Sequence, residues 1–335
     1  MRAVALLSGG LDSILALKLI LEQGIEVVAL NLILPFLSER GDYAGATARR
    51  FGIPLVRVEA CEEYLAILRS PKYGYGSAMN PCIDCHIYML RKAKAVAEQV
   101  DASFIVTGDV LGERPMSQHR RALELEDKEA CVEGKVLRPL SARLLPETIP
   151  ERAGWIDRSK LLAIRGKSRK TQIALAKRYN LGGAYPTPSG GCLLTCREFA
   201  SRVRDILMHN KDRALTMKEV ELLKVGRHFR FGASRIIVGR NERENEVLKQ
   251  LRDADDYLFE VRGCGSPITI LKGSKSREAV ELAAKLTVRY SDAVVNADAD
   301  TDTEAVVEYW AGDEMRKMAV PPLKDSDSVI ARFRI

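Results

Sequence analysis

The sequence lacks any apolar run of about 18 residues, the length that a membrane-spanning helix needs, so we expect no membrane partner. It also lacks a collagen-like excess of glycine and proline, since its 335 residues include 24 Gly and 13 Pro. Hydrophobic residues make up 46% and charged residues 29%, which is typical of globular proteins and excludes a disordered chain. The length favours about two domains.

A disulfide framework is a further feature that the sequence lacks. The seven cysteines are an odd number, and the chain does not begin with a basic leader followed by an apolar segment. We therefore expect a cytoplasmic protein, in which closely spaced cysteines bind metals or take part in redox chemistry. Two pairs of cysteines are close in sequence, namely Cys82 with Cys85 and Cys192 with Cys196.

Positive charge exceeds negative charge and is concentrated in two stretches. The net charge is +7 and the pI is near 9.0. Residues 152–178 carry nine Lys or Arg against one acidic residue, and residues 197–252 carry fourteen against eight. This concentration favours a polyanionic partner, although solvated helix faces would give the same pattern.

The first half of the chain alternates short apolar runs with segments of helical periodicity, which is the pattern of parallel β-α-β units. We therefore predict an α/β domain with a parallel sheet over residues 1–183. Helices are expected at residues 11–22, 44–51 and 85–100, and in the basic stretch 152–178. Strands are expected at residues 2–7, 26–34, 55–58, 103–107 and 136–140.

The second half predicts a smaller α+β domain. Residues 184–191 are dense in helix breakers, and a helix is expected at 197–208, so residues 184–210 form a cysteine-bearing loop and linker. A basic domain follows at 211–295, and residues 296–335 are expected to be a strand-rich extension. Strands are expected at residues 228–231, 235–238, 257–261, 268–271, 305–310 and 329–335.

Six residues between the first predicted strand and the first predicted helix contain the parts of a phosphate site. Glycines let the backbone approach phosphate oxygens, amides at a helix start point at them, and a carboxylate can hold magnesium. A Gly-Gly pair alone would indicate only a tight turn, but the complete set favours nucleotide binding. The six are Ser8, Gly9, Gly10, Leu11, Asp12 and Ser13.

These residues resemble the SGG-x-DS loop of the ATP pyrophosphatase (PP-loop) family, whose members cleave ATP to AMP and pyrophosphate while adenylating a carbonyl oxygen. The resemblance implies an adenine-nucleotide alpha-hydrolase-like fold for residues 1–183, with ATP and Mg²⁺ as ligands. It leaves the acceptor of the AMP group open.

Further motifs resemble those of tRNA thiolation enzymes. Residues 80–85, Asn-Pro-Cys-Ile-Asp-Cys, are similar to the Asn-Pro-Asp-x-x-Cys motif of tRNA 2-thiouridylases, and residues 189–192 to the loop with their second cysteine. Residues 106–112, 117–118 and 137–140 are similar to the TGE-x-LGQ, SQ and LRPL stretches of tRNA 4-thiouridine synthetases. The resemblance implies catalytic roles for Asp12, Cys85, Asp109 and Cys192. It implies nucleotide or base contacts for Gly108 and Gln118.

Cys82, Cys85 and Cys192 form a C-x-x-C pair with a distant third thiolate, which could hold a 4Fe-4S cluster with one iron free of protein ligands. As in related thiolases, that iron could bind hydrosulfide. A persulfide relay needs only Cys85 and Cys192, so Cys82 in place of the family's aspartate favours the cluster. A zinc site stays open, with Cys196 or His86 as fourth ligand.

Residues 219–229 and 237–241 resemble the RNA-binding domain of ribosome-quality-control factors, which fits a tRNA partner. The expected function is ATP-dependent tRNA uridine thiolation, with 4-thiouridine at position 8 favoured and sulfide or a cysteine-desulfurase-type protein as sulfur donor. Alternatives are a persulfide-relay 2-thiouridylase, an RNA-binding factor with a remnant nucleotide domain, and an enzyme acting on a small molecule. A homodimer is compatible with the sequence. The expected RNA contacts are Arg165, Lys167, Arg169, Lys170, Arg227 and Arg240.

Overall fold

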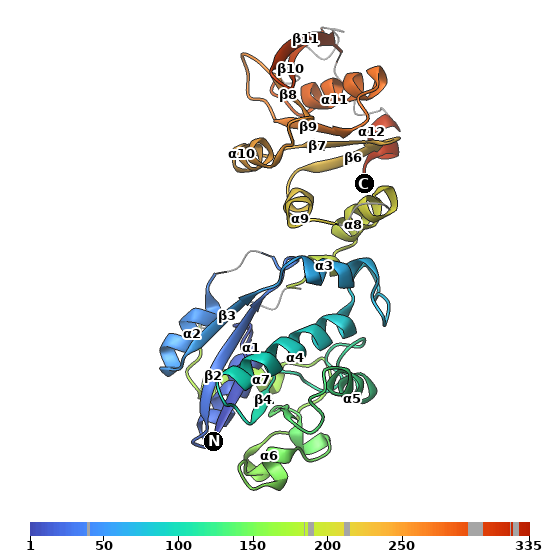
Figure 1. Cartoon of the computed structure of the whole chain (residues 1–335). Helices are drawn as coiled ribbons and strands as arrows, with labels where there is room; N and C mark the ends of the chain where they lie inside the picture. The colour runs from blue at the N-terminus through green and yellow to red at the C-terminus, as the bar shows by residue number, and fades with distance from the viewer. Residues whose placement is uncertain are drawn as a thin grey trace. The chain divides into compact units, whose positions relative to one another are not determined.

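The computed structural model describes residues 1–38, 41–183, 185–186, 191–210, 215–293, 304–321, 323 and 328–335. The chain divides into two compact units, Met1–Cys196 and Arg197–Ile335 (Figure 1). No helix in the described part of the chain is long and apolar enough to cross a membrane.

The first unit is built on a parallel sheet with strand order β3-β2-β1-β4-β5. Its central strand, β1 (Arg2–Leu6), pairs with β2 (Glu26–Ile33) and β4 (Phe104–Val106). The outer strands are β3 (Leu55–Glu59) and β5 (Val136–Leu137). Three successive residues of β1 are buried, because helices cover both faces of the sheet. The predicted α/β class is therefore confirmed.

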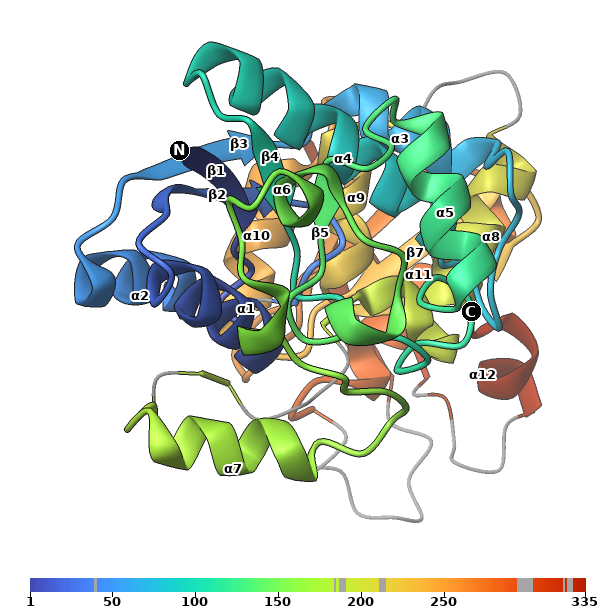
Figure 2. The same cartoon turned by 90° about the horizontal axis from the view of Figure 1, so that it is seen from below.

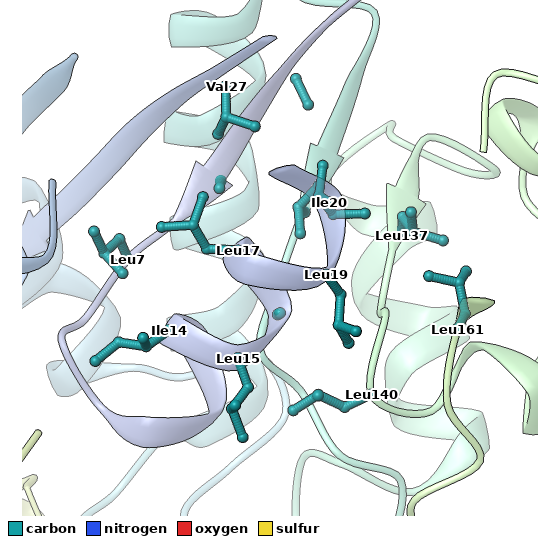
Figure 3. Packing of buried hydrophobic residues seen from close by; sticks show 14 of the residues in the cluster. Leu7, Ile14, Leu15, Leu17, Leu19, Ile20, Val27, Leu137, Leu140 and Leu161 are labelled. Carbon is teal, nitrogen blue, oxygen red and sulfur yellow. The ribbon is translucent and has the colours of Figure 1, made fainter. Parts of the chain in front are cut away.

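Helices α1 and α7 lie on one face of this sheet and α4 on the other (Figure 2). Figure 3 shows Leu15 and Leu19 of α1 near Leu140, with Ile14 on the other side of the helix toward Leu7. Of the basic stretch 152–178, only residues 170–178 form a helix of two turns or more. The helices of this unit are α1 (Leu11–Leu21), α2 (Tyr43–Phe51), α3 (Glu62–Arg69), α4 (Cys82–Gln99), α5 (Arg120–Glu129), α6 (Ile149–Arg152) and α7 (Lys170–Arg178).

The second unit contains an antiparallel sheet of order β11-β10-β8-β9-β7-β6. Helix α11 (Arg277–Arg289) covers one face, while α9 (Met217–Lys224) and α10 (Glu242–Leu251) cover the other. Helix α8 (Arg197–His209) begins the unit. The strands are β6 (Arg227–Phe231), β7 (Ser234–Val238), β8 (Tyr257–Val261), β9 (Thr269–Gly273), β10 (Ala305–Ala311) and β11 (Glu314–Val320).

The end of the chain differs from the prediction. The strand expected at 329–335 is wrong, because Ser328–Phe333 forms helix α12. Ile330 and Phe333 are three residues apart, so one face of the helix turns both toward the core. Strand β11 was not predicted because its edge position leaves it mostly charged and exposed, and it pairs with β10 through a turn at Gly312.

Candidate nucleotide and thiol site

The phosphate loop joins β1 to α1. Gly9 has φ +76°, and a Cβ there would lie 2.6 Å from the Cβ of Tyr43, so glycine is required for both the turn and the packing. Gly10 caps α1 without a side-chain hydrogen bond. The first backbone N–H groups of α1 are therefore available to a phosphate group, which the helix dipole also favours.

The serines close this loop on itself. The Ser13 hydroxyl donates to the Gly10 carbonyl oxygen at 2.8 Å, and the Ser8 and Ser13 hydroxyls lie 3.3 Å apart. Leu11 is buried in the core, so its side chain anchors the helix and only its backbone can face a ligand. Gly108, after β4, approaches α1 so closely that a Cβ would lie 2.6 Å from the Ser13 nitrogen.

Asp12 lies near Arg169, Gln172 and Arg114. Burial raises its pKa, although Arg169, Gln172 and Arg114 lower it. Its Oδ2 lies 3.6 Å from Nη2 of Arg169. Within the described residues, Asp12 Oδ1, Arg169 Nε and the Gln172 amide are buried without hydrogen-bond partners. Such unpaired groups are costly unless a ligand or ion completes them, which marks a binding site beside the loop.

The first pair of cysteines sits at the start of α4. The Tyr64 hydroxyl donates to Cys85 Sγ at 3.1 Å, and Asn80 Nδ2 donates to Cys82 Sγ at 3.1 Å. Tyr64 is 2% exposed, and burial raises its own pKa. These donors would stabilise sulfur that carries negative charge, whether as thiolate or as metal ligand.

Cys192 is fixed beside the segment that follows β2. It forms an isolated antiparallel bridge with Leu37, and Leu193 N donates to the Phe36 carbonyl at 2.8 Å. Met79 N, close to the first cysteine pair, donates to the Leu194 carbonyl at 3.2 Å. The predicted loop residues Ser189 and Gly190 lie outside the described residues.

The three thiols lie near enough to perturb one another. Burial raises the pKa of Cys85 to about 12, the Tyr64 hydroxyl and Arg114 lower it, and Cys192 and Cys82 raise it. Burial also raises the pKa of Cys192, and Cys82 adds to that effect. Cysteines that are 107 positions apart in sequence thus share one site.

The spacing of the three thiols is wider than that of a closed zinc site. In the described residues, no three Cys, His or carboxylate ligand atoms of this site lie within 4.8 Å of one another. Sulfurs around one zinc would be about 3.8 Å apart, whereas the thiolates of a cluster bind separate irons and can be more distant. Of the two residues expected as a fourth zinc ligand, His86 already contacts a carboxylate and Cys196 is exposed. His86 Nδ1 lies 3.2 Å from Oε2 of Glu126.

A loop formed by residues 111–118 contacts both the nucleotide site around Asp12 and the thiol site around Cys82 and Cys85. The Gly112 and Gln118 backbones are hydrogen-bonded, and Gly166 N donates to the Leu111 carbonyl at 2.8 Å. On the other side, Asn80 Nδ2 lies 3.9 Å from Met116 Sδ. Arg114, in the middle of the loop, is exposed and lowers the pKa values of both Asp12 and Cys85.

Asp109 and Gln118 hold this loop. Gln118 Nε2 donates to Asp109 Oδ1 at 3.0 Å, and the Thr107 hydroxyl donates to Oδ2 at 2.7 Å. Burial raises the pKa of Asp109, but His86, Arg138 and these donors outweigh it and lower the pKa overall. Each Asp109 oxygen accepts from a protein donor, and these bonds fix the orientation of the carboxylate.

The expected RNA-contacting cations fall into two groups. Arg165, Lys167 and Lys170 are exposed. Three others have protein neighbours. Arg169 faces Asp12, the Arg227 guanidinium lies 4.4 Å from the centroid of the Tyr290 ring, and Arg240 Nε donates to Glu244 at 2.8 Å.

Sequence reasoning missed Tyr64, Arg114 and Gln172. Only Gln172 had a usable signal, because it lies four residues before Ala176 on the buried face of α7, where a polar residue is unusual. Tyr64 and Arg114 reach the site through tertiary packing alone.

Two family models match the chain. Residues 1–129 match the tRNA methyl transferase HUP domain, and residues 226–333 match the NFACT protein RNA binding domain. The first unit is thus similar to HUP domains over residues 1–129, and the resemblances stated for both halves are confirmed.

Individual relatives are more distant. The tRNA-specific 2-thiouridylase MnmA of Syntrophomonas wolfei subsp. wolfei is 24% identical over 187 residues, which cover 54% of this chain and 51% of the relative. The chain therefore spans about half the length of that curated relative. Similar solved structures include the U34-tRNA thiolase NcsA from Methanococcus maripaludis with its 4Fe-4S cluster, at 18% identity and TM-score 0.34, covering 67% of this chain and 73% of that one. Another is a 4-thiouridine synthetase in complex with RNA and ATP, at 21% identity and TM-score 0.38, covering 62% and 51%.

Proposed function

From a HUP-type PP-loop domain joined to a domain that matches an RNA-binding model, we propose an ATP-dependent tRNA uridine sulfurtransferase. The enzyme adenylates a uridine carbonyl oxygen and replaces that oxygen with sulfur. The observation that carries this proposal is the loop of residues 111–118, which contacts both sites. Its Leu111 carbonyl accepts from Gly166 N, three residues before Arg169, and its Met116 Sδ lies 3.9 Å from Asn80 Nδ2, which donates to Cys82 Sγ.

In the first step, the free amides of α1 bind the phosphates of ATP. The unpaired oxygen of Asp12 fits a magnesium ligand, and we expect Arg169 and Gln172, which have unpaired polar atoms beside it, to contact the nucleotide. The uridine oxygen attacks the α-phosphorus and pyrophosphate leaves. The adenylated oxygen is then a good leaving group, as part of AMP. The uridine must be out of its stack for this reaction.

In the second step, a hydrosulfide sulfur attacks the same carbon, and AMP leaves with the former carbonyl oxygen. No net oxidation occurs with hydrosulfide as donor. The persulfide alternative ends with Cys85 and Cys192 as a disulfide, so it requires a cellular thiol reductant. Arg114, whose charge lowers the pKa values of Asp12 and Cys85, would stabilise the departing phosphate and the incoming sulfur anion.

Cys82, Cys85 and Cys192 fit a 4Fe-4S cluster, because three buried or half-buried thiols converge with hydrogen-bond donors on two of the sulfurs. A bound cluster would supply a Lewis-acidic iron for the sulfur donor. The residues of the chain would hold it, exclude water and keep the donor near Arg114.

The tRNA is expected to bind through Arg165, Lys167 and Lys170 and through the second unit, in the cytoplasm, where tRNA is modified. We favour 4-thiouridine at position 8. A 2-thiouridine product would favour the persulfide alternative.

The test is anaerobic incubation of reconstituted protein with unmodified tRNA, ATP and sulfide. Expected results are tRNA-dependent pyrophosphate release, thiouridine in the tRNA, and a broad visible absorbance. Cys82→Ala, Cys85→Ala and Cys192→Ala should each lose the absorbance and thiolation, while Cys61→Ala, an exposed cysteine, should retain both.

Partial results separate the alternatives. Activity retained in Cys82→Ala alone favours the persulfide relay, since that relay does not use Cys82. Binding of tRNA without pyrophosphate release would support instead an RNA-binding factor with a remnant nucleotide domain, and would refute the enzyme.

A further inference from the structure

The second unit contains a hollow of about 370 Å³ on the sheet face that α10 covers in part. Its floor is apolar and consists of Leu258, Ile268 and Trp310. Trp310 lies directly opposite Leu258 in the pairing of β10 with β8. Leu258 and Ile268 are buried, whereas Trp310 is only half-buried. Trp310 is therefore a partly exposed aromatic residue in the lining of the hollow.

The rim of the hollow is basic. Lys249 and Arg252 lie at the end of α10, and Arg262 follows β8, so three cations face the single carboxylate of Glu260 in the lining. The guanidinium of Arg262 lies 5.7 Å from the Trp310 ring centroid.

These cations differ in how they are engaged. Lys249 contacts Glu246 at 2.7 Å, and Arg262 donates to Glu308 at 3.0 Å. Both are surface contacts that an anion can replace at little cost. The Arg252 side chain makes no hydrogen bond or ion pair with any residue that the structure describes. The rim thus offers positive charge to a ligand.

We propose that this hollow binds one unpaired nucleotide of an RNA, with its base stacked on Trp310 and its flanking phosphates at Lys249 and Arg252. An aromatic floor with a basic rim is the combination that binds single-stranded nucleic acid. An acidic peptide would use the rim but leave the indole face without a partner. The inference rests on the proposed function only for its RNA partner, and it assigns a contact site within the second unit.

The experiment uses the fact that the chain has two tryptophans, Trp155 and Trp310. In the full-length Trp155→Phe variant, Trp310 is the only tryptophan fluorophore. Titration with an oligouridylate of about eight nucleotides should quench its emission to a plateau, because a stacked base quenches indole. Heparin should bind the rim without comparable quenching. Quenching by heparin equal to that by the oligonucleotide, or none by the oligonucleotide, would overturn the proposal.

Affinity measurements on further variants test the same contacts. Trp310→Ala should weaken oligouridylate binding about tenfold, and Trp310→Phe should retain most of the affinity. Arg252→Ala should reduce the slope of log K against log salt by about one, because one phosphate contact is lost. Lys285→Ala is the matched control, since Lys285 pairs with Glu281 on α11 over the opposite sheet face and should change nothing.

The two proposals fail in different ways. Normal quenching without tRNA thiolation by the unsubstituted chain would refute the sulfurtransferase and leave this site intact. Normal thiolation with an unchanged KM for tRNA in both Trp310→Ala and Arg252→Ala would refute this site and leave the sulfurtransferase intact.

Discussion

Gly108, which follows β4, lies close to the first turn of α1, and Gly108→Ala tests whether this close approach shapes the site. An alanine Cβ would lie 2.6 Å from Ser13 N, 2.7 Å from Ser13 Cα and 2.8 Å from Asp12 C. All three are backbone atoms of the first turn of α1, so no side-chain rotation can relieve the clash. Reaching normal contact requires a movement of about 0.8 Å.

Overpacking of this kind costs about 1–3 kcal/mol, which for a unit of this size lowers Tm by about 2–12 °C. Gly182→Ala is the control, since a Cβ there meets nothing within 4 Å. It should be neutral or stabilise by up to about 1 kcal/mol, because alanine restricts the unfolded chain.

The assay is thermal unfolding of the full chain with and without ATP. ATP should raise the Tm of the parent and of Gly182→Ala, since a ligand stabilises the state that it binds. Gly108→Ala should show a lower Tm and a smaller shift with ATP. Equal Tm values and equal ATP shifts in the two variants would refute the role of this contact in shaping the phosphate loop.

Three further predictions concern charged groups. Burial raises the pKa of Asp12 above 3.8 in the folded chain, so the ionised carboxylate costs folding stability as the pH rises above 3.8. Asp12→Asn should therefore increase the urea midpoint at pH 7 while abolishing pyrophosphate release. A lower urea midpoint would contradict this sign. Arg114→Met should reduce the single-turnover rate of thiolation about 10–100-fold with unchanged tRNA binding. Arg121→Met, which changes an exposed arginine on α5, should have no effect. Equal thiolation rates in both variants would contradict a role of Arg114 in the reaction. Burial lowers the pKa of Arg235 to about 10, so its charge destabilises the second unit at pH 7. Arg235→Met should therefore increase the free energy of unfolding by about 1–4 kcal/mol. A decrease would show that the Arg235 guanidinium is stabilised by an interaction that compensates its burial.

Local sequence patterns were sufficient for most of the first unit. The run of buried residues in β1, the glycines after it and the helical period of α1 follow one another without a break, so the β-α unit and its phosphate loop could be predicted together. The residues 329–335 could not be assigned in this way. So short a segment fits both a period of two and a period of 3.6 residues, and tertiary packing selected the helix.

The site was predictable where one contiguous motif carries it and not where packing assembles it. The three cysteines were predicted from their motifs, and their role stays a prediction. Tyr64, which donates to Cys85, comes from α3, and nothing in its local sequence indicates that contact. The contact of Asp109 and Gln118 with a ligand stays a prediction. Their mutual hydrogen bond could not be predicted from the sequence, because it depends on how the 111–118 loop packs against the end of β4.

The most direct test of the central claim is mass spectrometry of tRNA nucleosides from a strain that lacks this protein. The proposed function predicts loss of one thiouridine, restored by the intact chain and not by Asp12→Asn or Cys85→Ala. An unchanged thiouridine content in the deletion strain, or full restoration by both variants, would contradict the sulfurtransferase.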